Sequence, residues 1–148
     1  MKDTALNTTF NIYLLYPTNR DDEGNFYRLL QNYINIGIEL QAYLIDWEKM
    51  DGLPKSYLYV PADHELFIHK AYQDSLLTKE QISYINHKII EECNLLICFG
   101  HIMGLSDATN ELEYAKQKNI PIYTMPDLSP KAIQALRLAI KIIIKSED

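Results

Sequence analysis

The sequence predicts an α/β protein with a doubly wound parallel sheet of four or five strands and helices on both faces. Two observations carry this prediction. Short apolar runs, above all residues 95–99 (LLICF), are typical of strands that are buried on both faces. Segments with helical periodicity stand between these runs, and strands that alternate with helices build parallel sheets through crossover connections.

The first third of the chain is expected to form a strand, a helix and a second strand. Residues 10–15 (FNIYLL) form a short apolar run that a proline ends. Residues 26–36 carry apolar side chains at helical spacing, and Gly37 is predicted to end this helix. Residues 38–45 alternate apolar and polar side chains, which predicts an edge strand.

Residues 46–77 lack a sustained period and are predicted to form an irregular insert. The segment contains Gly52, Pro54 and Pro61, together with several aromatic and histidine residues. Structureless loops of this length in compact domains are usually functional or contain short helices. We expect a short helix near residues 63–72 and a role for the insert as a lid or pocket wall.

The remaining elements follow in regular alternation. Thr78 and Gln81 form a T-x-x-Q capping box, which predicts the start of a helix that runs to Cys93. Ser129 and Pro130 provide an N-cap and a first-turn proline for the last helix. The expected elements are a strand at 95–99, a helix at 107–118 ending at Asn119, a strand at 120–125 and a helix to about 145. With right-handed crossovers the simplest strand order is 2-1-3-4.

Composition limits the classes of function. The 148 residues are predicted to form one domain, with disordered ends at about 1–8 and 146–148. The net charge of −6, without a cluster of basic residues, argues against a protein that binds nucleic acid by neutralising phosphates. Residues 1–9 lack a signal-peptide pattern, and no apolar run is long enough to span a bilayer. We therefore expect a cytoplasmic protein without a membrane partner.

The cysteines and histidines give no pattern for a metal or a disulfide framework. Cys93 and Cys98 are read as reduced, buried thiols. His64 and His69 lie five residues apart, which is off the spacing that places two side chains on one helix face. No metal and no cofactor are expected.

The last helix is apolar on more than one face. Ile133, Leu136 and Ile140 form one stripe, whereas Leu138 and Ile142 point elsewhere. A surface helix of a monomer should not expose so much aliphatic area. A homo-oligomer, a dimer or higher, that uses residues 130–145 is expected.

The predicted strand order places a ligand crevice between the carboxyl ends of the first and third strands. Those ends are Tyr16 with Pro17 and Gly100 with His101. Glu111 would lie near the start of the following helix, where the dipole favours its ionised form. An ionised carboxylate in a cleft is a competent nucleophile, although a first-turn glutamate is also common as a dipole partner alone.

Two stretches resemble the nucleoside 2-deoxyribosyltransferase-like superfamily, whose fold is Rossmann-like. IYLLYP (12–17) is similar to its I-Y-L-A-x-P start, and FGHIMGLSDATNELEYAKQKNIPIY (99–123) is similar to its S-G-x-x-x-E motif and the helix and strand that follow. VPADHEL (60–66) looks like a variant of the V/A-P-H-x-L stretch found in a small, uncharacterised bacterial and phage branch.

The resemblance implies roles for individual residues. Glu111 would attack the anomeric carbon of a nucleoside or nucleotide and form a glycosyl ester, as in retaining glycosidases. Tyr13 would orient this carboxylate, and Asp63 or Asp107 would supply a second one. Ser106 and the backbone of residues 100–105 would hold ribose or phosphate oxygens. The substrate-binding set would then comprise Tyr16, Pro17, Asp63, Gly100, His101, Ser106 and Asp107.

Two hypotheses of function from different classes follow. The first is an N-glycosidase or 2-deoxyribosyltransferase that uses Glu111. The second is a non-catalytic nucleotide-binding or sensing module, because Leu105 and Asp107 stand where the transferases carry aspartate and glycine. A flavodoxin-type or response-regulator domain is a weaker third reading, because the first loop lacks paired acidic residues directly after the strand and phosphate-loop glycines are absent.

Overall fold

The computed structural model describes residues 9–17, 23–100 and 107–146. Within these residues the order of helices and strands agrees with the sequence prediction, except that the second strand lies at Ser56–Tyr59 instead of 38–45. The strands are β1 (Phe10–Leu15), β2 (Ser56–Tyr59), β3 (Leu95–Phe99) and β4 (Ile122–Met125). The helices are α1 (Glu23–Asp51), α2 (Glu65–Gln73), α3 (Lys79–Glu91), α4 (Asp107–Gln117) and α5 (Pro130–Ser146), with a 3₁₀ turn at Pro61–Asp63.

The strands form one parallel sheet with the order β2-β1-β3-β4. β1 is central and pairs with both neighbours: Ile12 lies opposite Leu58 of β2 and Leu95 of β3. β3 then pairs with β4, so that Phe99 lies opposite Met125. The predicted fold class and the order 2-1-3-4 are confirmed.

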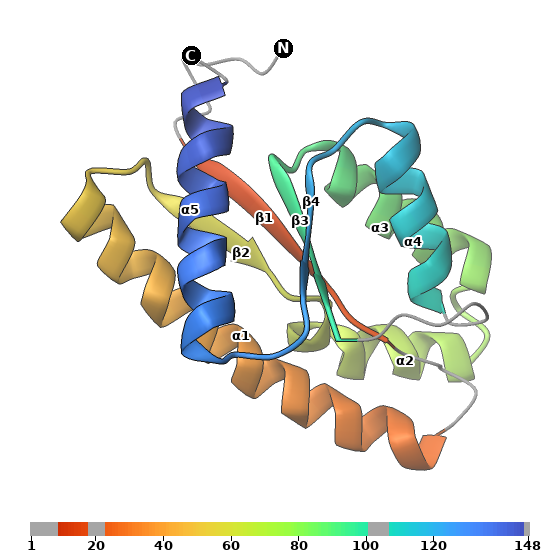
Figure 1. The fold of residues 1–148 in the computed structure, drawn as a ribbon. Coiled ribbons are helices and arrows are strands. Elements are labelled where there is room, and N and C mark those ends of the chain that lie inside the picture. The colour runs from red at the N-terminus through yellow and green to blue at the C-terminus, as the bar shows by residue number, and fades with distance from the viewer. Residues whose placement is uncertain (1–8, 18–22, 101–106, 147–148) are drawn as a thin grey trace.

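Helices cover both faces of the sheet (Figure 1). Alternate residues of each strand face opposite sides, so β1 sends Ile12 and Leu14 into a core cluster with α1 and α5. Tyr13 and Leu15 point into a second cluster with α3 and α4. The sheet therefore separates two layers that differ in composition.

Helix α1 corrects the prediction for residues 26–45. The chain does not end a helix at Gly37 and does not form a strand at 38–45; one helix runs from Glu23 to Asp51. The period-2 pattern was coincidental, because Leu40 and Leu44 are buried in the core whereas Ile38 is 67% exposed. Residues buried at a spacing of three and four determine that this segment is helical.

Gly37 lies inside α1 because of a close contact. A Cβ atom at this position would lie 2.7 Å from the Cγ2 atom of Val60, just after β2. The glycine lets α1 approach the end of β2 rather than stopping the helix. A helix interior tolerates a glycine at a cost of about 1 kcal/mol, which tertiary packing can offset.

The segment 46–77 is more regular than predicted. It holds the end of α1, the edge strand β2, the 3₁₀ turn and α2, so the second strand of the sheet comes from Ser56–Tyr59. Glu48 Oε2 accepts a hydrogen bond of 2.8 Å from the Ser56 N–H, which joins the helix end to the strand. The short helix expected near 63–72 is confirmed as α2.

The caps of the later helices are confirmed. Thr78 and Gln81 form the reciprocal capping box of α3. The Ala132 N–H donates to Ser129 Oγ at the start of α5, over 3.3 Å. Asn119, with φ of 57°, follows α4 in the left-handed conformation typical of helix ends. Ser146 belongs to α5, contrary to the prediction that disorder begins there; residues 1–8 and 147–148 lie outside the described residues.

Both cysteines are free and buried, as predicted. Among the described residues, no helix combines the length and the apolar character that crossing a membrane requires.

Candidate functional site

The carboxyl ends of β1 and β3 meet, as the strand order predicts. Gly100 follows β3 with φ of 78°, and its Cβ position would lie 3.7 Å from Pro17 Cδ and 3.7 Å from the Tyr33 hydroxyl. Tyr16 is buried and its ring stacks on that of Tyr33, with centroids 4.2 Å apart. The two strand ends and α1 thus form one wall beside the predicted crevice.

Glu111 faces the sheet from α4. Ala108, Glu111 and Ala115 are spaced by three and four residues, and all three are buried on the helix face that packs on β1 and β3. The small alanines bring the helix close to the strands. As a result, the Tyr13 hydroxyl of β1 donates a hydrogen bond to Glu111 Oε1. The expected pairing of Tyr13 with Glu111 is present in the structure.

The Tyr13 ring belongs to a stack of three rings. It lies 5.5 Å from the Tyr59 ring, which lies 5.4 Å from the His64 ring. Burial, followed by the Glu111 carboxylate, raises the pKa of Tyr13 well above its usual range. Burial and then the Glu65 carboxylate raise the pKa of Tyr59 to about 12. Both phenols therefore stay protonated at neutral pH, so Tyr13 remains a hydrogen-bond donor.

Glu111 lines a cavity of about 100 Å³. The floor comes from Leu14 and Leu15 of β1 and from Tyr16, which follows this strand. Its polar wall comes from α2, α3 and α4, and comprises Glu65, Lys79, Ser83, Asn86, Asn110 and Glu111. Roughly 10–15 Å³ of such space admits one water molecule, so the cavity accommodates a fragment of the size of a sugar ring.

Glu65 is the functional candidate that sequence reasoning missed. It lies in the first turn of α2, is buried, and lines the cavity together with Glu111. Asp63, the residue chosen from the sequence, is exposed and is not part of the cavity wall. A carboxylate in the first turn after a proline-initiated 3₁₀ turn was the available signal.

This signal is hard to recognise because α2 buries polar side chains and exposes an apolar one. Glu65 and His69, four residues apart, are both buried, whereas Phe67 is 84% exposed. His69 packs on the Phe26 ring, with centroids 4.2 Å apart. The usual rule that apolar residues face the core would therefore predict the opposite orientation of α2, with Phe67 buried and Glu65 exposed.

Helix α3 contributes the cavity residues Lys79, Ser83 and Asn86. Their spacing of four and three residues places them on one face. Ile82 and Ile90 are buried on the same helix as Asn86, whereas Ile85 is 40% exposed. An asparagine buried between two isoleucines is the sequence feature that marks this face.

Three predicted site residues cannot be compared with the structure. His101 and Ser106 lie outside the described residues, and so does the side chain of Asp107, whose backbone begins α4.

Two buried carboxylates, one lysine and two amides line the cavity, and the Tyr13 hydroxyl donates to one of these carboxylates. Carboxylates can act as nucleophile or general acid, and amides can bind hydroxyl groups. Within the described ranges, no three histidine, cysteine, aspartate or glutamate side chains gather where they could hold a metal ion.

Comparison with known proteins adds no relative: no family model, no curated protein and no solved structure matches the chain.

Proposed function

We propose that this protein cleaves the N-glycosidic bond of a nucleoside or nucleotide, as an N-glycosidase or 2-deoxyribosyltransferase, with Glu111 as the nucleophile. The observation that carries the proposal is the buried Glu111 carboxylate, held by the Tyr13 hydroxyl at the wall of a sugar-sized cavity. The resemblance of IYLLYP and the segment around Glu111 to the deoxyribosyltransferase-like superfamily supports it.

The chemistry needs two carboxyl groups with different roles. Glu111 attacks the anomeric carbon, the bond from that carbon to the base nitrogen breaks, and the base leaves with its electron pair. Glu65 lines the same cavity and is the second carboxyl group placed to exchange a proton with the departing base. Water, or a second base, then attacks the glycosyl ester and frees Glu111.

Tyr13 and the two asparagines serve orientation. Tyr13 orients the carboxylate of the nucleophile through its hydrogen bond to Glu111 Oε1. Asn86 and Asn110 line the cavity and provide donors and acceptors for sugar hydroxyls. These groups are on helices and a central strand, and such elements hold a site more precisely than loops do.

The test is base release from a panel of nucleosides, 2′-deoxynucleosides, their 5′-monophosphates and NAD, measured by chromatography. We expect release by the wild-type protein and a loss on the order of 10³-fold or more in Glu111→Gln. Glu113→Gln is the matched control, because Glu113 is exposed on the same helix. Base release that is equal in Glu111→Gln and wild type, or no release from any substrate, would contradict the proposal.

A covalent intermediate gives a second readout. A 2′-fluoro-2′-deoxynucleoside slows hydrolysis of the glycosyl ester, so the intact protein should gain the mass of the sugar. The modified peptide should contain Glu111, and the Glu111→Gln variant should gain no mass.

A non-catalytic nucleotide-binding or sensing module is the second candidate. It is favoured by Leu105 and Asp107, which depart from the transferase pattern. This candidate predicts that nucleotides raise the melting temperature equally in wild type and Glu111→Gln, without product. Detection of free base would exclude it.

A further inference from the structure

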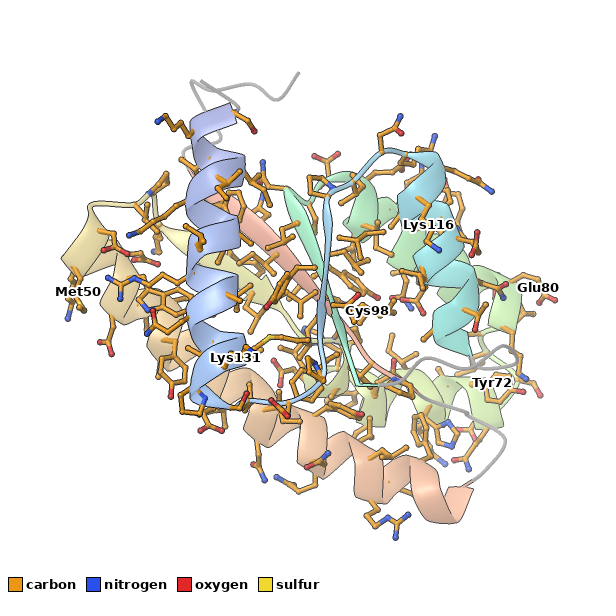
Figure 2. All side chains as sticks on the ribbon, viewed as in Figure 1. Met50, Tyr72, Glu80, Cys98, Lys116 and Lys131 are labelled. Carbon is orange, nitrogen blue, oxygen red and sulfur yellow. The ribbon has the colours of Figure 1, made fainter. Side chains whose placement is uncertain are left out.

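Helices α1 and α5 form the outer layer on one face of the sheet (Figure 1). Both helices expose aliphatic side chains. On α1 the exposed residues include Ile38, Ile45 and Met50, and on α5 they include Leu138 and Ile142, each 59% exposed. Figure 2 shows Met50 at the outer end of α1. Exposed aliphatic residues on two adjacent helices mark an interaction surface.

The two exposed stripes carry opposite charges. Glu39 and Asp46 lie among the exposed aliphatic residues of α1, with Lys49 in its last turn. On α5 the exposed charged residues are basic: Lys131, Lys141 and Lys145. An apolar stripe with acidic neighbours therefore lies beside an apolar stripe with basic neighbours.

An ion pair fixes how the two helices sit. Arg137 donates two hydrogen bonds to Asp51, from Nε over 2.7 Å and from its terminal nitrogen over 2.6 Å. Lys141 Nζ lies 3.4 Å from the same carboxylate. A bidentate pair of this kind holds both helices in one orientation, so the surface is preformed.

We propose that this surface binds a second copy of the chain, with α1 of each copy packed on α5 of the other. A two-fold axis requires that a patch complement itself, and a patch with one acidic and one basic stripe meets this requirement. The aliphatic residues then meet at the centre, while the acidic side chains of α1, among them Glu39 and Asp46, face the basic side chains of α5 of the second copy, among them Lys131 and Lys145.

The size of the surface is sufficient. At 1.5 Å per residue, the 29 residues of α1 and the 17 of α5 are about 43 Å and 25 Å long. With a helix diameter of about 10–12 Å, the two outer faces together span roughly 680–820 Å², which is close to the roughly 800 Å² per subunit of a stable interface. The sequence predicts an oligomer interface on α5 alone, and the proposed interface adds α1 as the surface that α5 of the second copy contacts.

Sedimentation equilibrium of the full chain tests the proposal with two charge-reversed variants. The first is Glu39→Lys with Asp46→Lys, and the second is Lys131→Glu with Lys145→Glu. We expect a wild-type dimer, and dissociation constants raised at least about tenfold in each variant, since like charges then face each other at both contacts. Circular dichroism checks that both variants are folded.

Mixing the two variants is the decisive measurement. A mixed dimer pairs basic α1 with acidic α5 at one contact and the native charges at the other, so dimerisation should return to the wild-type constant. Lys116→Glu is the control, because Lys116 is exposed on α4 (Figure 2) and should change nothing. A monomeric wild type, an unaffected Lys131→Glu with Lys145→Glu variant, or no recovery on mixing would each overturn the proposal.

Discussion

The two faces of the sheet use the same strands for different purposes. On the side of α1 and α5, β1 and β3 present Ile12, Leu14 and Ile97 to a large apolar cluster. On the side of α3 and α4 the apolar cluster is smaller, the buried Glu111 and Glu65 side chains line a cavity, and the buried Tyr13 hydroxyl donates to Glu111. The first face contributes more of the apolar burial that stabilises the fold, and the second face also holds polar groups whose burial costs free energy.

This division shows how a four-stranded sheet can hold a polar cavity on one face and an apolar core on the other. Neighbouring residues of β1 point in opposite directions, so Tyr13 shares its strand with Ile12 and Leu14 without disturbing their packing. Changes on the two faces should therefore separate stability from activity.

The largest effect is expected from Leu136→Ala. Leu136 is fully buried between α5 and the sheet. The lost contacts and the resulting cavity should lower the free energy of unfolding by about 2–5 kcal/mol, measured by urea denaturation. Gln134→Ala, an exposed change on the same helix, should stay within about 0.5 kcal/mol. The rate of base release by folded Leu136→Ala should equal that of the wild type; a lower rate would break the separation of the faces.

A smaller effect, confined to activity, is expected from Tyr13→Phe. The change removes the hydrogen bond to the Glu111 carboxylate and keeps the ring. A hydrogen bond to a charged group contributes about 1.5–3 kcal/mol, so kcat/KM for base release should fall roughly 10- to 100-fold. Tyr123→Phe is the control on the other face, since it removes a hydroxyl that donates to the Ala132 carbonyl. Equal rates in Tyr13→Phe and wild type would show that Tyr13 does not position Glu111.

The smallest effect concerns alkaline pH. Tyr59 keeps its proton in the folded state up to about pH 12, whereas an unfolded tyrosine loses it near pH 10. Above about pH 10 the folded state therefore binds more protons than the unfolded state, and stability falls as the pH rises. Tyr59→Phe removes this contribution, so its alkaline unfolding midpoint should lie at higher pH than that of the wild type.

Tyr57→Phe is the matched comparison for that measurement, because Tyr57 is exposed on the same strand. An alkaline midpoint that moves equally in both variants would contradict the assignment to Tyr59.

The fold was predictable where local chemistry and burial agree. The apolar run 95–99, the capping box at Thr78 and the proline after Ser129 each specify one structure, and each prediction is confirmed. The pairing of Tyr13 with Glu111 is what the resemblance to the deoxyribosyltransferase-like superfamily implies, and the hydrogen bond between them is present.

The predictions are wrong where one residue type is compatible with two different structures. Glycine ends helices in many proteins, but Gly37 lies inside α1 and allows this helix to contact Val60. The buried residues of α1 continue at a spacing of three and four through this glycine, at Phe26, Leu30, Tyr33, Gly37, Leu40, Leu44 and Trp47. Glu65 was missed because α2 buries its polar face, and only the tertiary structure supplies the cavity that accepts a carboxylate there.

The hydrogen bond between Tyr13 and Glu111 joins residues that are 98 positions apart. In a parallel sheet such distant segments meet late, because the intervening chain must first be ordered. Under the proposed function, base release would report completion of folding, since an intermediate that lacks α4 lacks Glu111 at the cavity. Refolding followed by activity should lag behind refolding followed by the helical signal of α1, which forms from local contacts.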